Sequence, residues 1–178
     1  MARLNVVNPE KATGKVKEIF DGPLKGKHFN LFKGLANSPA ALNFYLAMGG
    51  ALKDAALSEK EREAIALAVG EANGCDYCVA AHTTLGKMAG LKEEQTLGAR
   101  KGRVEGDAKL DALVRFATAL HEKRGYVSDD DLKSFRDAGY NDGHVAEAVA
   151  CYAQNVFTNY FNHVNESDID FPAPPALS

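Results

Sequence analysis

The sequence lacks an excess of charge of either sign and a long uninterrupted apolar run. It has 21 Lys and Arg against 24 Asp and Glu, a formal net charge of -3, which favours neither nucleic acid nor an anionic membrane as a partner. The first seven residues hold no apolar core of signal-peptide length. The most apolar stretch, 148–163, is interrupted by Asn, Gln and Thr side chains, which argues against a membrane span. We therefore expect a cytoplasmic protein.

Cysteine is scarce, with only 3 in 178 residues. Without a signal peptide, so few cysteines do not make the disulfide framework of a secreted protein. Two of them lie in one short run, Glu71-Ala-Asn-Gly-Cys-Asp-Tyr-Cys-Val-Ala-Ala-His82. In a reducing cytosol, such a close pair is more often catalytic or metal-binding than structural. The third, Cys151, stands among apolar neighbours and is predicted to be a buried small hydrophobe.

Alternating strand patterns are also missing, and the chain reads as helix after helix. We expect one all-α domain over residues 1–178, with a core motif region at about 40–125 and C-terminal helices at 127–165. Ser58 and Glu61 form a capping box, and Pro39 after Ser38 is typical of a helix start. The remaining caps, glycines and apolar spacings predict helices at 11–20, from 39, 58–73, 75–88, 91–97, 107–123, 128–139 and 142–163, and an extended tail at 171–176 that lies over a surface.

The cysteine run has the features of a redox site. On one helix, Cys75, Cys78 and His82 stand at i, i+3 and i+7, so two thiols and an imidazole share a face. A free thiol has a pKa of about 8.5, and the thiolate is the reacting species. Gly74 ends the preceding helix and leaves both cysteines in the first turn of the next, where unpaired backbone N–H groups and the helix dipole favour negative charge.

The positions also suggest a division of roles. Cys78 is nearest to His82, which can accept its proton, so Cys78 is the expected nucleophile. Cys75 is the expected partner that resolves a sulfenic acid or mixed disulfide on Cys78. Glu63 and Glu71, on the preceding helix, are both placed to orient or polarise the histidine.

Other chemistries compete for the same residues. Two cysteines and a histidine are three potential zinc ligands, and His121 or His163 could supply a fourth in the folded chain. A non-enzymatic thiol redox sensor would use the same pair. Haem attachment requires a histidine where Val79 stands, and no βαβ pattern surrounds the pair as in a thioredoxin.

The spacing of four residues resembles a known family. Glu63, Cys75, Cys78 and His82 fit the pattern of the alkylhydroperoxidase D (AhpD)-like branch of the carboxymuconolactone decarboxylase superfamily, in which a Glu stands twelve residues before Cys-x-x-Cys and a His four after it. The run 57–90 resembles that family's core domain. The run 155–163 resembles the ending of its peroxidase-related subgroup.

The resemblance implies an oligomeric AhpD-like helical bundle, a trimer or a hexamer built as a trimer of dimers. It implies reduction of hydroperoxides, or electron transfer to a peroxiredoxin, with a thiol or dithiol as reductant. Cys78 would be the peroxidatic thiol and Cys75 the resolving one. His82 with Glu63 would form the proton relay, which leaves Glu71 an auxiliary role. No metal or cofactor beyond a redox-active Cys75–Cys78 disulfide is implied.

One position departs from the family pattern. The best-known members carry a second histidine between the two cysteines, where this chain has Tyr77. A tyrosine can form hydrogen bonds but does not act as a base near neutral pH. We therefore expect a shorter relay, with weaker peroxidase activity or a different substrate. Decarboxylation of a lactone is not expected, because the decarboxylase branch lacks the thiol pair.

Overall fold

The computed structural model describes residues 1–177 and is all-helical over that range, as the sequence predicts, with no strand. Neighbouring helices are joined by short loops and one 3-10 turn, η1. The elements are α1 (Gly14–Asp21), α2 (Asn30–Leu35), α3 (Pro39–Ala51), η1 (Leu52–Asp54), α4 (Glu59–Ala72), α5 (Asp76–Met88), α6 (Glu93–Arg100), α7 (Ala108–Glu122), α8 (Asp129–Asp137) and α9 (Asp142–Asn165).

The predicted helix starts are confirmed because the expected side chains cap them. Polar side chains accept hydrogen bonds from backbone N–H groups in the first turns of α3, α4, α7, α8 and α9, which satisfies donors that a helix otherwise leaves unpaired. These caps are Ser38, Ser58, Asp107, Ser128 and Asn141.

Two N-terminal segments differ from the sequence-based expectation. The helix expected over 11–20 begins only at Gly14, because residues 8–11 form a turn closed by the Lys11 N–H on the Asn8 carbonyl. The six-residue α2 was not predicted. It is too short to be stable alone, and the Asp170 carboxylate, far along the chain, accepts from its first N–H, that of Asn30, at 2.7 Å.

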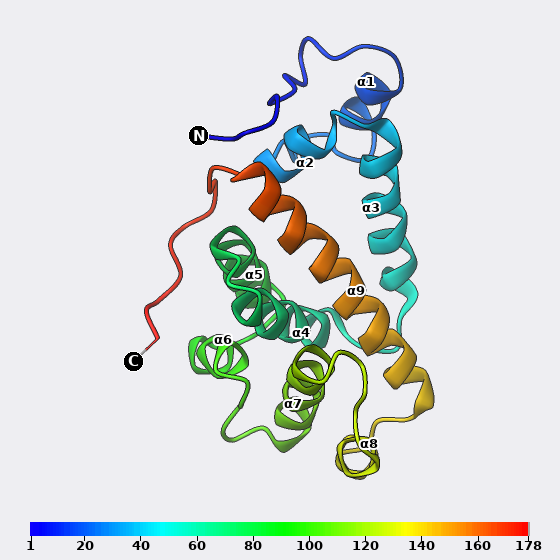
Figure 1. Ribbon diagram of the computed structural model, residues 1–178, viewed down its shortest axis with the longest axis vertical. Coiled ribbons are helices and arrows are strands. Elements are labelled where there is room, and N and C mark those ends of the chain that lie inside the picture. The colour runs from blue at the N-terminus through cyan, green and yellow to red at the C-terminus, as the bar shows by residue number, and fades with distance from the viewer. Residues whose placement is uncertain (178) are drawn as a thin grey trace.

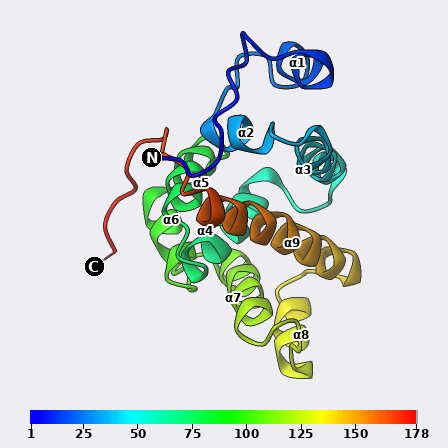
Figure 2. The ribbon, with the colours of Figure 1, turned by 45° about the horizontal axis from the view of Figure 1, so that its top comes forward.

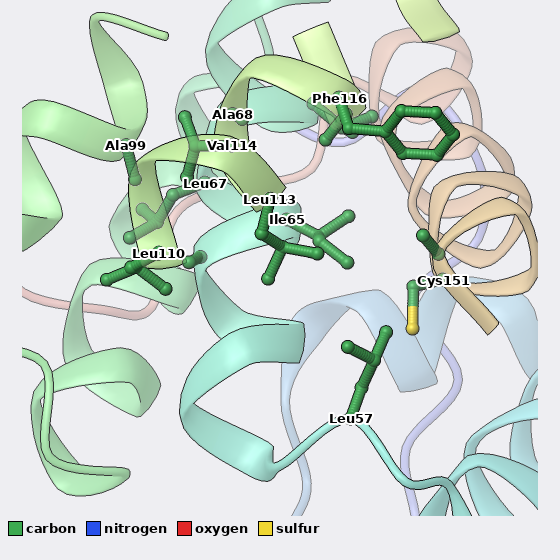
Figure 3. Close-up of a cluster of buried hydrophobic side chains, with 14 of the residues drawn as sticks. Leu57, Ile65, Leu67, Ala68, Ala99, Leu110, Leu113, Val114, Phe116 and Cys151 are labelled. Carbon is green, nitrogen blue, oxygen red and sulfur yellow. The ribbon is translucent and has the colours of Figure 1, made fainter. Parts of the chain in front are cut away.

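Helix α4 is the central element and contacts α5, α6, α7 and α9. Its buried side chains, among them Ile65 and Leu67, join Leu113 of α7 and Cys151 of α9 in the main hydrophobic core (Figure 3). A second core brings α1, α2 and α3 against the start of α5, and it includes both Cys75 and Cys78. The cysteine pair therefore lies inside the protein.

The long helix α9 runs diagonally across the molecule, with α4 and α5 on one side and α3 on the other (Figure 1). After α9 the chain turns back, and its tail passes along the outside of α5 and α6 in both views (Figures 1 and 2). Arg100 of α6 holds this tail by donating to the Pro175 carbonyl at 2.6 Å. Over residues 1–177, none of the helices combines the length and the apolar character that crossing a bilayer requires.

Candidate active site

The site begins at the break between α4 and α5. Gly74 adopts a φ of 65°, a left-handed conformation that glycine adopts without steric cost. The chain then starts α5 with Cys75 at the cap position, and its sulfur accepts from the Cys78 N–H at 3.3 Å. Cys75 and Cys78 form a disulfide, with Cα atoms 5.3 Å apart. Both residues are at least 98% buried, so very little of either side chain is directly exposed to solvent.

His82 lies on the face of α5 that packs against α4. Its Nδ1 is 2.8 Å from Oε2 of Glu63, and the two side chains are only 19% and 15% exposed. The carboxylate fixes the ring orientation and leaves Nε2 to exchange a proton with a substrate. Glu71 is placed elsewhere: it pairs with Arg100 at 2.7 Å. Of the two acids considered from the sequence, the structure thus brings Glu63 to the histidine.

A small cavity of about 80 Å³ opens beside Cys78. Cys78, His82 and Asn162 supply polar groups to its lining. The other walls are mostly aromatic or aliphatic and include Phe29, Phe32, Tyr45, Tyr77, Leu85 and Phe171. Such a lining suits a small molecule with an apolar body and one polar, reactive end.

His82 also borders a wider cavity of about 230 Å³, where Glu63, Arg62 and Lys53 provide charged groups. A separate surface groove of about 400 Å³ lies against Cys75 and is bordered by Asp76 and Glu166. The two cysteines therefore face different spaces: Cys78 borders the inner apolar cavity and Cys75 the outer groove.

Tyr77, which stands in place of the family's second histidine, is 5% exposed. Its hydroxyl accepts from the Leu31 N–H at 3.2 Å and donates to the Asp170 carboxylate at 2.8 Å. Burial, together with Asp170, raises the pKa of Tyr77 above its ordinary value although the Leu31 bond opposes this. The residue is therefore a neutral phenol that ties α5 to α2 and to the tail.

The tail closes the cavity on the same side. Phe171 packs on Phe29, with ring centroids 4.7 Å apart, and meets the Tyr77 ring edge-on at 5.8 Å. The extended tail was predicted from its prolines. The contribution of the tail to the cavity was not predicted, because no sequence pattern relates Phe171 to residues so distant in the chain.

Asn162 of α9 is a residue of the site that the cysteine motif does not include. The structure places it in the site within a single chain: its Nδ2 lies 3.3 Å from the Cys78 sulfur. The available signal was a set of asparagines on an otherwise apolar helix, since buried amides need partners.

The remaining cysteine and histidines stay outside this cluster. Cys151 is 2% exposed in the main core, as predicted, and burial raises its pKa to about 11. His121 lies beside Tyr152, and His163 stacks on Tyr160. Within residues 1–177, no three His, Cys, Asp or Glu side chains gather in a way that would hold a metal ion.

Comparison with known proteins agrees with the resemblance seen in the sequence. Residues 39–119, from α3 through most of α7, match the model of the carboxymuconolactone decarboxylase family. This range includes Glu63, Cys75, Cys78 and His82. No curated protein matches the chain.

Solved structures share the fold. A peroxidase-related protein of Ralstonia eutropha JMP134, described as an alkylhydroperoxidase AhpD core, is 22% identical, with a TM-score of 0.84 over 95% of this chain and 92% of that one. A peroxidase-related protein of Silicibacter sp. TM1040 is 23% identical, with a TM-score of 0.78 over 93% and 89%.

A cysteine-to-alanine variant of the debrominase Bmp8, solved in complex with 2,3,4-tribromopyrrole, is 15% identical, with a TM-score of 0.75 over 96% and 94% of the two chains. The fold is thus common to proteins with different described activities. The chain is thus similar to the carboxymuconolactone decarboxylase family over residues 39–119, and it folds like the alkylhydroperoxidase AhpD core.

Proposed function

We propose that this protein is a thiol-dependent peroxidase that reduces small organic hydroperoxides. The observation that carries the proposal is the position of Cys78. It lies at the start of a helix and borders an apolar cavity that it shares with His82. A thiolate there is stabilised by the helix N-terminus, and the cavity accepts an apolar group next to it.

The reaction starts from the reduced protein, in which His82 takes the proton of Cys78. The thiolate attacks the terminal oxygen of the hydroperoxide, the O–O bond breaks, and the alkoxide leaves with the electron pair. Protonated His82, held by Glu63, returns the proton to the alkoxide and an alcohol forms. Cys78 is left as a sulfenic acid. The Cys75 thiol then attacks that sulfur, releases water and closes the disulfide.

A thiol or dithiol reductant, or a peroxiredoxin partner, must then reopen the disulfide. We place its approach at the outer groove beside Cys75, because Cys78 borders the inner cavity instead. Peroxide and reductant would thus reach the pair from different sides. As in the family it resembles, the protein would act as a trimer or hexamer, in the cytoplasm, with no metal or further cofactor.

The test is peroxide consumption by wild type, Cys78→Ser and Cys75→Ser, with dithiothreitol as reductant and cumene hydroperoxide, tert-butyl hydroperoxide and hydrogen peroxide as substrates. Cys75→Ser is a conservative control because serine also caps helices. We expect turnover in wild type and none in Cys78→Ser. When dithiothreitol, which itself reduces sulfenic acids, is left out, Cys75→Ser should stop at a sulfenic acid that dimedone traps.

Two results contradict the proposal. One is undiminished turnover in Cys78→Ser. The other is a wild-type protein that none of the three peroxides oxidises. Oxidation of the pair without turnover by any thiol would instead favour the redox-sensor alternative.

A further inference from the structure

Asn162 is the polar group of the apolar cavity that the proposed reaction leaves without a role. It is 4% exposed. Its Nδ2 donates to the Cys78 sulfur at 3.3 Å, and its Oδ1 is buried without a hydrogen-bond partner among the described residues. An unsatisfied buried oxygen is costly, and most such groups in native proteins find a partner. Asn162 also lines the apolar cavity of about 80 Å³ beside Cys78, which is the space a small ligand would occupy.

Two other buried asparagines of α9 use their amides to hold the fold. Asn155 donates to the Cys151 carbonyl at 2.8 Å, within its own helix. Asn165 accepts from the Leu4 N–H at 3.1 Å and donates to Ser167 at 2.8 Å. The Asn162 amide instead donates to the Cys78 sulfur. A role in holding the fold together therefore does not explain why an asparagine stands at this position.

We propose that Asn162 is a catalytic residue that holds both the Cys78 thiolate and the incoming hydroperoxide; this rests on the proposed function. The sulfur in the structure is that of a disulfide, which stands in for the thiolate of the reduced protein. An N–H bond to a charged acceptor is shorter and about twice as strong as one to a neutral acceptor. The Asn162 Nδ2–H group therefore binds the Cys78 thiolate of the reduced protein more strongly than it binds the disulfide sulfur.

The amide oxygen completes the arrangement. A hydroperoxide, R–O–O–H, carries the one hydrogen of its peroxide group on the terminal oxygen, which is the atom that the thiolate attacks. When Oδ1 accepts from that O–H, it directs the terminal oxygen at the Cys78 sulfur. After the O–O bond breaks, the same O–H group belongs to the sulfenic acid. The hydrogen bond from this O–H to Asn162 Oδ1 is therefore kept through the step. The alkoxide takes its proton from His82.

The test uses full-length protein in the Cys75→Ser background, where Cys78 cannot form the internal disulfide. Asn162→Leu removes donor and acceptor at similar volume. Asn162→Asp keeps the volume and an acceptor but replaces the donor with a negative charge. Thr158→Val is the matched control, because it removes a buried α9 hydroxyl that bonds the Asn155 carbonyl within the helix. Circular dichroism verifies that each variant is folded.

Two rates are measured for each variant by mass spectrometry: alkylation of Cys78 by iodoacetamide against pH, without peroxide, and oxidation by cumene hydroperoxide. Asn162→Leu and Asn162→Asp should move the alkylation midpoint to higher pH. They should also slow oxidation about ten- to a hundredfold, the range for a lost hydrogen bond to a charged group. In Asn162→Leu, which lacks the acceptor, part of that loss should persist at a pH where Cys78 is fully ionised. Thr158→Val should keep both rates.

The two measurements separate the ways in which the proposal can fail. Unchanged alkylation in both Asn162 variants overturns the contact with the thiolate. Slower oxidation of Asn162→Leu that disappears at full ionisation of Cys78 overturns the bond to the hydroperoxide. An equal loss in Thr158→Val overturns a specific role for the amide. If the background protein is not oxidised by any hydroperoxide, the proposed function fails, and that failure is visible before any Asn162 variant is compared.

Discussion

Replacing Glu63 with glutamine tests whether the carboxylate acts through His82. The change keeps the size of the side chain and a hydrogen-bonding group 2.8 Å from Nδ1, but removes the negative charge. Both side chains are largely buried, so solvent screens the pair only in part. A hydrogen bond between charged groups contributes about 1.5–3 kcal/mol and a neutral one about 0.5–1.5 kcal/mol. The difference, about 1–1.5 kcal/mol, is the expected loss.

That loss falls on the step in which the protonated imidazole supplies a proton to the alkoxide. One factor of ten in rate corresponds to about 1.4 kcal/mol, so Glu63→Gln should slow Cys78 oxidation about five- to tenfold. The assay is rapid mixing of reduced protein with cumene hydroperoxide, acid quenching and counting of the remaining thiols. A loss of a hundredfold or more would instead mean that Glu63 itself transfers protons, the range typical of general acid–base groups.

Glu71→Gln is the matched control, with the same chemical change on the same helix. Glu71 pairs with Arg100 and not with the histidine, so its replacement should leave the oxidation rate within about twofold. An unchanged rate in Glu63→Gln, or an equal loss in both variants, would refute the assignment of Glu63 as the partner of His82.

Three further predictions follow from the packing. Phe171→Ala removes a cavity wall with two aromatic contacts, so the unfolding free energy measured in urea should fall by about 1–3 kcal/mol, and the rate with cumene hydroperoxide should fall relative to hydrogen peroxide. Burial raises the pKa of Cys151 to about 11, so at pH 8 only about 0.1% is thiolate, and peptide mapping should find it unmodified by iodoacetamide until the protein unfolds. Gly98→Ala would place a methyl carbon 2.7 Å from the Arg103 carbonyl. It should lower the unfolding free energy by about 1–3 kcal/mol, which a lower melting temperature would report. Gly50→Ala, with open space around it, should be neutral or stabilising.

Local signals in the sequence predict most of the helices. Ser58 with Glu61, and Ser38 before Pro39, determine helix starts through side chains a few residues apart, so their effect does not depend on the rest of the fold. Gly74 likewise predicts the break that puts Cys75 at a helix start. Helix α2 escaped prediction because a six-residue helix has little pattern of its own and depends on tertiary contacts.

The site is predicted from the sequence only where its residues share one helix. Cys78 and His82 follow from helical spacing. Glu63 could not be separated from Glu71 by spacing alone, and the family resemblance selected it. Asn162 and Phe171 come from α9 and the tail, and their approach to Cys78 is set by how those segments pack, which no local pattern encodes.

The Tyr77–Asp170 hydrogen bond has a consequence for folding. It joins residues 93 positions apart, and contacts of such long range form late and slowly. During synthesis the N-terminal part of a chain is made first, so the residues of α4 and α5 exist before the tail that walls the cavity. For that interval the two thiols lack the aromatic enclosure described above and are open to oxidants of any size. Discrimination among oxidants is therefore a property of the finished chain, and a nascent or partly unfolded molecule would react without it.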